Sequence, residues 1–155
     1  MHIFLYGPVG AGKSTVGKVL ARNLLLPFVD VDQVIETDAD RTIYQIMMEE
    51  GEMVYRDWES AVLKQVVENR ESVIALGGGA LLRPENRTVV EDTGRVVFLA
   101  AKFDTLLERL GSDSNQRPLL AGDLREKLSS LLAKRKEHYD SFSLRLDAAQ
   151  SPEEL

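Results

Sequence analysis

The sequence contains no cysteine, so disulfide bonds and cysteine-ligated metal sites are excluded. It has only two histidines, His2 and His138, which are too few for a histidine-rich metal site. Long apolar runs are also missing. The apolar stretch 1–6 ends at Gly7 and is too short for a signal-peptide core or a membrane span. We therefore expect a cytoplasmic protein with no membrane partner.

The chain also lacks an excess of positive charge. Its formal net charge is -6 at pH 7, whereas proteins that bind nucleic acid are usually basic. We expect no nucleic-acid partner, although a local basic cleft for an anionic ligand is compatible with this charge. With 155 residues, 44% of them apolar and 28% charged, the sequence predicts a single globular domain over residues 1–155.

Short apolar runs alternate with segments of helical periodicity along the chain. Buried strands are predicted at residues 3–6, 28–32, 72–76 and 95–99, and an edge strand at 142–146. Strands that alternate with helices pair in parallel and carry helices on both faces. The sequence thus predicts an α/β fold with a five-stranded parallel sheet. The polar, irregular segment 111–122 is predicted to be a mobile lid.

One phosphate-binding motif stands between the first predicted strand and the first predicted helix. Residues 7–14 read Gly-Pro-Val-Gly-Ala-Gly-Lys-Ser and match the pattern G-x-x-x-x-G-K-[ST] in full. Its backbone N–H groups and the following helix N-terminus attract phosphate oxygens. Lys13 is expected on the β- and γ-phosphates and Ser14 on Mg²⁺. The alternative, a chance glycine-rich turn, does not account for this context, so we predict an ATP-using phosphotransferase.

Two aspartates follow the second predicted strand. Asp30 and Asp32 are two residues apart on what we expect to be extended chain, so both side chains should point the same way at the strand end. In this interpretation Asp30 acts on hydrated Mg²⁺, while Asp32 orients the acceptor hydroxyl and accepts its proton. The alternative is that Asp32 only caps the helix that follows. That helical stretch is expected to continue until Gly51.

Two arginines are predicted on apolar helix faces. Arg56 lies at the margin of the apolar face of a helix at 52–69, where Glu59 can hold it. The alternative is a solvated ion pair with Glu52 or Glu59. Arg135 takes a core-facing position in a leucine stripe. A buried guanidinium needs an anionic partner, which is either a structural carboxylate or a ligand anion such as a carboxylate.

Glycines and one further arginine complete the candidate site. Gly77, Gly78 and Gly79 follow the third predicted strand, where a backbone without side chains lets a flat substrate lie against it. The alternative is a plain flexible turn. Arg117 is the only positive charge in the segment 111–122. It is a candidate for closing over the phosphates, and the alternative is a surface arginine.

Together these segments resemble the shikimate kinase family over nearly the whole chain. The matching stretches are residues 7–15, 30–32, 51–56, 77–79, 117–120 and 134–135. The phosphate loop is shared by many kinases, whereas the ordered set is specific. The resemblance implies ATP-dependent phosphorylation of the 3-hydroxyl of shikimate, in the chorismate pathway to aromatic amino acids. It also implies a P-loop three-layer fold similar to that of nucleoside monophosphate kinases.

The resemblance further implies roles for individual residues. Shikimate would be bound by Asp32, Arg56, Gly78 and Arg135, with both arginines on its carboxylate. ATP would be bound by Gly10, Ala11, Gly12, Lys13, Ser14, Thr15, Arg117 and Gln150, the last in the adenine loop. Ser14 would hold Mg²⁺, Asp30 would act through metal-bound water, and the catalytic residues would be Asp32, Lys13 and Arg117. Arg109 resembles a second adenine-side arginine, one residue farther from Arg117 than is usual. We expect a monomer.

Family members usually continue with a helix after the fifth strand. Ser151 and Pro152 predict the start of such a helix, so we expect either a trimmed chain or one that continues past Leu155. Two rival functions stay open. One is another small-molecule P-loop kinase, for gluconate or a nucleoside monophosphate. The other is a catalytically idle module of the same fold, against which the intact Lys13 and Asp32 argue.

Overall fold

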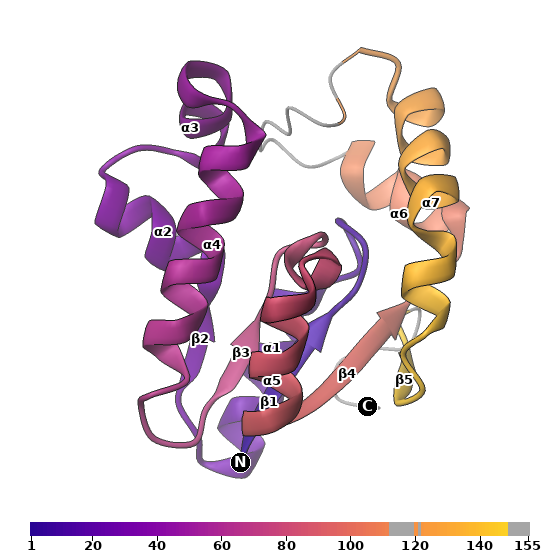
Figure 1. The fold of residues 1–155 in the computed structure, drawn as a ribbon. Helices are drawn as coiled ribbons and strands as arrows, with labels where there is room; N and C mark the ends of the chain where they lie inside the picture. The colour runs from indigo at the N-terminus through magenta and orange to yellow at the C-terminus, as the bar shows by residue number, and fades with distance from the viewer. Residues whose placement is uncertain (112–119, 121, 149–155) are drawn as a thin grey trace.

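The computed structural model describes residues 1–111, 120 and 122–148, which form a five-stranded sheet surrounded by helices (Figure 1). The strands are β1 (His2–Tyr6), β2 (Phe28–Asp30), β3 (Val73–Ala75), β4 (Gly94–Ala100) and β5 (Arg145–Asp147). They lie in the order β2-β3-β1-β4-β5, and every neighbouring pair is parallel. The predicted parallel sheet is confirmed, and β5 is an edge strand that begins three residues later than predicted.

Helices cover both faces of this sheet. They are α1 (Lys13–Leu24), α2 (Val31–Ala39), α3 (Ile43–Glu50), α4 (Glu52–Val66), the 3-10 helix η1 (Ala80–Leu82), α5 (Pro84–Thr93), α6 (Phe103–Gly111) and α7 (Leu124–Asp140). Successive strand residues point to opposite faces, so Phe4 and Tyr6 belong to one core cluster and Leu5 to the other. The first cluster includes buried residues of α2, α4 and α5, and the second those of α1 and α6. The result is a three-layer α/β domain.

The junction between β2 and α2 differs from the prediction. The strand ends at Asp30, whose carboxylate accepts a hydrogen bond from the backbone N–H of Gln33 and so caps α2. Asp32 therefore lies in the first helical turn and not on extended chain. The prediction of one strand over 28–32 is wrong, and so is the alternative in which Asp32 is the cap. An N-cap residue is itself extended and bonds to the third helical N–H, which suits Asp30 at the strand end.

The helical stretch expected before Gly51 is also divided. Helix α2 ends before Asp40, which has a left-handed backbone with φ of 52°. Thr42 then caps α3 through a reciprocal capping box with Gln45. At the start of α7, Asp123 accepts a hydrogen bond from the N–H of Glu126 and caps the helix.

Two predictions concern segments at the margin of the described structure. The expected lid at 111–122 lies outside the described residues except for its two ends and Leu120. The helix start expected at Ser151 also lies outside them. Among the described helices, none is long and apolar enough to cross a membrane.

Candidate active site

A cavity of about 970 Å³ collects almost all of the predicted site residues. It lies beyond the carboxyl ends of β1, β2 and β3, where ligands of open α/β sheets bind. The predicted residues that line it are Gly10, Gly12, Lys13, Ser14, Thr15, Asp30, Asp32, Arg56, Gly78 and Arg135. Ala11 is buried beside them at 1% exposure. Arg117 and Gln150 lie outside the described residues.

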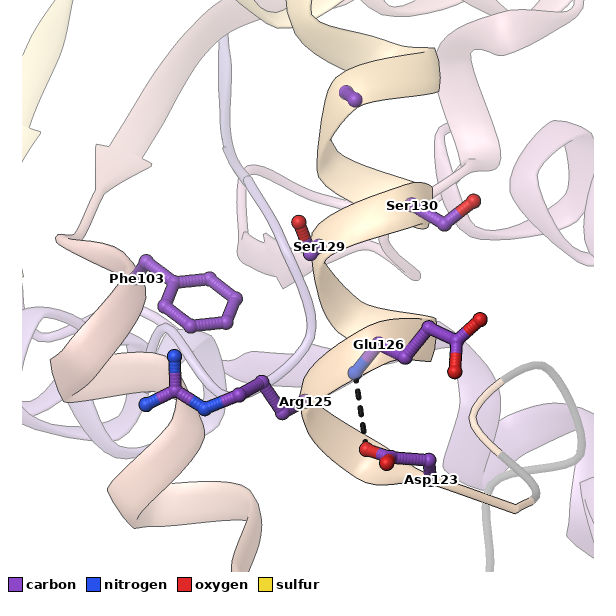
Figure 2. A pocket seen from close by; sticks show the side chains of 7 residues that line it. Phe103, Asp123, Arg125, Glu126, Ser129 and Ser130 are labelled. Carbon is purple, nitrogen blue, oxygen red and sulfur yellow. Dashed lines mark hydrogen bonds between the residues drawn. The ribbon is translucent and has the colours of Figure 1, made fainter.

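A second hollow lies between α6 and α7, away from these residues (Figure 2). Two of its polar side chains are engaged locally. Asp123 caps α7, and the Arg125 guanidinium stacks over the Phe103 ring at 5.4 Å from its centroid. None of the predicted site residues line this hollow, so the chemistry of the described chain gathers in the larger cavity.

The phosphate loop joins β1 to α1 through backbone conformations that only glycine adopts readily. Gly10 and Gly12 have φ angles of 85° and 91°, in the left-handed region. Gly12 is the N-cap of α1 and supplies no side-chain acceptor, which leaves the first N–H groups of the helix available to an anion. The Lys13 ammonium donates to the Gly7 carbonyl at 2.6 Å. Backbone donors and a cation thus meet at one end of the cavity.

Two oxygen groups beside the loop form a candidate Mg²⁺ site. The Ser14 hydroxyl donates to Asp30 Oδ2 at 2.8 Å, while Asp30 Oδ1 caps α2. Within the described residues no cluster of three or more acidic or histidine side chains could hold a metal. A hydroxyl and a carboxylate fit Mg²⁺, which prefers oxygen ligands and keeps several waters or substrate phosphates rather than a full protein cage.

Asp32 is held from the opposite wall of the cavity. Its Oδ1 accepts a hydrogen bond of 2.7 Å from the Tyr55 hydroxyl on α4. The same hydroxyl lies 3.1 Å from Glu59 Oε2. Burial raises the pKa of Asp32 above its ordinary value, and the Tyr55 hydrogen bond opposes this rise. Burial likewise raises the pKa of Glu59, with the charge of Arg56 opposing it. A more basic Asp32 carboxylate is better suited to accept a proton.

Arg56 is tied to two acids of its own helix. Its Nη1 lies 2.9 Å from Glu59 Oε1, and its Nη2 lies 3.2 Å from Glu52 Oε2. The expectation that Glu59 holds Arg56 is confirmed. The solvated alternative fits Glu52 alone, because the Glu59 side chain is only 1% exposed while that of Glu52 is 47% exposed.

Arg135 is buried on α7, as its place in the leucine stripe predicts, with 7% exposure. Its Nη1 donates to the Tyr139 hydroxyl at 3.3 Å, and that hydroxyl donates to the Gly78 carbonyl at 2.6 Å. No carboxylate of the described residues lies within ion-pair distance of Arg135. The structural-carboxylate alternative therefore has no support in this part of the chain, and a ligand anion is the remaining candidate.

The guanidinium groups of Arg56 and Arg135 both lie close to the backbone of the triple glycine. A Cβ atom at Gly79 would lie 2.5 Å from Arg56 Nη2 and 3.0 Å from Arg135 Nη2. A Cβ atom at Gly77 would lie 2.8 Å from the Tyr55 hydroxyl. A side chain here would have to displace the polar groups that converge over the backbone from α4 and α7. The plain-turn alternative does not explain these approaches.

Sequence reasoning misses two contributors to the site and the contacts of a third. The Tyr55 hydroxyl gives no signal of its own in the sequence. Tyr139 follows Arg135 by one helical turn, but nothing in the sequence marks it as a polar contact in the site. Arg109 donates to the carbonyls of Gly10, Ala11 and Ala148 at 3.3, 3.0 and 2.7 Å. It therefore joins the phosphate loop to the end of β5, a contact that spacing alone cannot reveal.

This fold and site define the class of the protein. A phosphate loop between β1 and α1, with carboxylates at the end of β2 on a parallel sheet, is the arrangement of a P-loop kinase. The family model described as shikimate kinase matches residues 9–155. The chain belongs to the shikimate kinase family.

Similar proteins agree with this assignment. Shikimate kinase of Francisella tularensis subsp. novicida is 41% identical over 143 residues, which cover 92% of this chain and 81% of that protein. Shikimate kinase of Symbiobacterium thermophilum is 43% identical over 141 residues, or 90% of this chain and 81% of that protein. The structure of shikimate kinase from Acinetobacter baumannii in complex with shikimate superposes with a TM-score of 0.90 at 37% identity, over 97% of this chain and 85% of that one.

More distant structures share the fold only. A gluconokinase from Sinorhizobium meliloti gives a TM-score of 0.63 at 23% identity, over 99% of this chain and 85% of that one. A deoxyadenosine kinase from M. mycoides gives 0.61 at 18% identity, over 99% of this chain and 94% of that one. These likenesses confirm the predicted similarity to nucleotide kinases in fold.

Proposed function

We propose that the protein transfers the γ-phosphoryl group of ATP to the 3-hydroxyl of shikimate, giving shikimate 3-phosphate and ADP. Membership in the shikimate kinase family supports this reaction. The observation that carries it is the convergence of Arg56 and Arg135 over Gly79, facing Asp32 and the phosphate loop in one cavity. This arrangement suits a compact substrate with a carboxylate at one end and a hydroxyl at the other.

The substrate carboxylate is assigned to the two guanidinium groups. Arg135 has no acidic partner among the described residues, and a guanidinium binds a carboxylate through paired, charge-assisted hydrogen bonds. Arg56 can share its donors between Glu59 and the substrate. We place the substrate ring against the backbone of Gly78, whose carbonyl accepts a hydrogen bond from Tyr139.

Asp32 is the proposed base at the acceptor hydroxyl. As the hydroxyl oxygen bonds to the γ-phosphorus, its proton passes to the Asp32 carboxylate, and the bond to the β–γ bridging oxygen of ATP breaks. Lys13 balances the charge that develops on the phosphates. The backbone N–H groups from Gly10 to Thr15 hold those phosphates at the N-terminus of α1.

Ser14 and Asp30 are the proposed Mg²⁺ residues, with Ser14 as a direct ligand and Asp30 acting through bound water. When bound with ATP, Mg²⁺ neutralises charge on the β- and γ-phosphate oxygens. Arg117 as a lid residue on the phosphates and Gln150 beside adenine stay predictions. A monomeric state, a cytoplasmic location and a single domain over 1–155 also stay predictions.

The release of ADP with and without shikimate tests the proposal. We expect release that depends on both shikimate and Mg²⁺, and that stops when EDTA is added. Gluconate and nucleoside monophosphates serve as competing acceptors in the same assay. If one of them is turned over much faster than shikimate, the substrate assignment is wrong even though the phosphate loop is functional.

A further inference from the structure

The Tyr55 hydroxyl lies between the Asp32 carboxylate, which lines the substrate cavity, and the buried carboxylate of Glu59. It is 2.7 Å from Asp32 Oδ1 and 3.1 Å from Glu59 Oε2. Tyr55 is 5% exposed and Glu59 is 1% exposed. The backbone of Gly77 packs against this cluster, because a Cβ atom there would lie 2.7 Å from Glu59 Oε2 and 2.8 Å from the Tyr55 oxygen. The three side chains are therefore packed tightly around one hydroxyl group.

A phenol has one proton to donate, and here two carboxylate oxygens lie within reach of it. The shorter contact is with Asp32, so that carboxylate is the main acceptor. The other charged groups near Asp32 are Asp30 of β2, Lys13 of α1 and Arg56 of α4. Tyr55 donates this hydrogen bond to the Asp32 carboxylate from α4. The orientation of Asp32 thus depends on a residue outside the phosphate loop.

The same hydroxyl completes a continuous path across the cavity. Arg56 binds Glu59 Oε1, Glu59 Oε2 meets the Tyr55 hydroxyl, and Tyr55 binds Asp32. Arg56 stands at the proposed carboxylate end of the substrate and Asp32 at its hydroxyl end. The distance between these two ends is therefore set by side chains of α4 and α2 that bond to one another.

We propose that Tyr55 is a positioning residue, whose hydroxyl holds the Asp32 carboxylate toward the acceptor hydroxyl and couples it through Glu59 to Arg56. This inference rests on the proposed phosphorylation of shikimate. The proposal assigns different roles to Tyr55 and Glu59, which both lie on α4. Tyr55 acts on the reacting end of the substrate, whereas Glu59 acts mainly on its carboxylate end through Arg56.

Steady-state kinetics of Tyr55→Phe test this role. The variant keeps the ring and removes only the hydroxyl. We expect kcat to fall by about tenfold, the order of one hydrogen bond to a charged group, while KM for shikimate and for ATP changes less than about twofold. Thr88→Val on α5 is the control for a lost hydroxyl, because this exposed side chain lies outside the cavity and its hydroxyl donates to the Pro84 carbonyl of its own helix. It should retain wild-type kinetics.

Two further variants show whether the effect passes through Asp32. In an Asp32→Asn background, Tyr55→Phe should lower kcat by less than about twofold, because residues that act as one unit are not additive. Glu59→Gln should show the opposite split, since glutamine still meets Tyr55 but holds Arg56 without charge. We expect it to raise KM for shikimate severalfold with a smaller change in kcat, and this result is available even if Tyr55→Phe fails to fold.

The outcomes separate the two proposals. A wild-type protein that does not phosphorylate shikimate overturns the proposed function and this inference together. An active wild type whose Tyr55→Phe variant keeps its kcat, or loses affinity for shikimate instead, overturns the inference alone. So does a Glu59→Gln variant that loses kcat with KM unchanged.

Discussion

Replacing Arg135 by leucine distinguishes a substrate ligand from a structural cation. Arg135 is 7% exposed, and its guanidinium donates to the Tyr139 hydroxyl at 3.3 Å and has no carboxylate partner among the described residues. Leucine matches the apolar stripe on which Arg135 stands. Tyr139 keeps its own hydrogen bond to the Gly78 carbonyl after the change. We therefore expect the ligand-free variant to be as stable as the wild type, or more stable.

The cost should appear on binding shikimate. A hydrogen bond to a charged group contributes about 1.5–3 kcal/mol, so affinity for shikimate should fall about 10- to 150-fold, while affinity for ATP hardly changes. Thermal melts and titration calorimetry, with and without shikimate, measure both quantities. Arg125→Leu is the matched control, because this exposed arginine lies on the same helix outside the cavity.

A structural role predicts the reverse pattern. Removing one partner of a buried ion pair typically destabilises a protein by about 3–5 kcal/mol. If Arg135→Leu melts far below the wild type and yet gains the full wild-type shift on adding shikimate, the guanidinium does not bind substrate. The assignment of Arg135 to the carboxylate would then be refuted.

Four other changes have defined outcomes. Lys13→Met should abolish ADP release and leave the circular dichroism spectrum unchanged, because the ammonium is expected to contact the ATP phosphates and not the core. Activity near that of the wild type would contradict the role assigned to the phosphate loop. Asp32→Asn should lower kcat by about 10²-fold or more, the scale of general-base contributions, and an unchanged rate would make Asp32 non-catalytic. Gly79→Ala should raise KM for shikimate with little change in melting temperature, because the new methyl group displaces the guanidinium groups of Arg56 and Arg135. An unchanged KM would show that this position tolerates a side chain without disturbing substrate binding. Burial lowers the pKa of His138 below 6.5, so the unfolded chain takes up this proton first and stability is lost as pH falls below that value. In His138→Gln the new side chain can still accept from the Tyr6 hydroxyl. The melting temperature of this variant should therefore fall less than that of the wild type between pH 7 and pH 5. An equal fall in both proteins would show that His138 is not the titrating group responsible.

Local patterns were enough to predict most of the sheet and the phosphate loop. The strands β1, β3 and β4 are largely apolar runs, whereas the short edge strand β5 is mostly polar and was placed three residues too early. The loop motif predicts both its own backbone and the start of α1. The β2–α2 junction was misjudged because an aspartate, a valine and an aspartate suit both a strand end and a helix start. Pairing with β3 decides between them: the last register pair is Asp30 with Ala75, where β3 ends. Beyond that pair the chain has no partner strand, and it turns into a helix.

The meeting of distant side chains was only partly predictable. Periodicity placed Arg56 and Arg135 on inward faces of their helices, but α4 and α7 are far apart in the sequence. That both guanidinium groups pass over Gly79 depends on how the helices pack on the sheet. The Tyr55 hydroxyl poses the same problem, since an aromatic position on an apolar stripe does not reveal which polar group its oxygen will meet.

The carboxylate of Asp30 has a consequence for local unfolding. One oxygen caps α2 and the other accepts the Ser14 hydroxyl in the first turn of α1. The first turns of two helices are thus linked through one side chain. We therefore expect the phosphate-binding end of the cavity and the start of α2 to open together in hydrogen exchange, as one cooperative unit. Amide protection lost at Gln33 should be accompanied by protection lost at the N-terminus of α1.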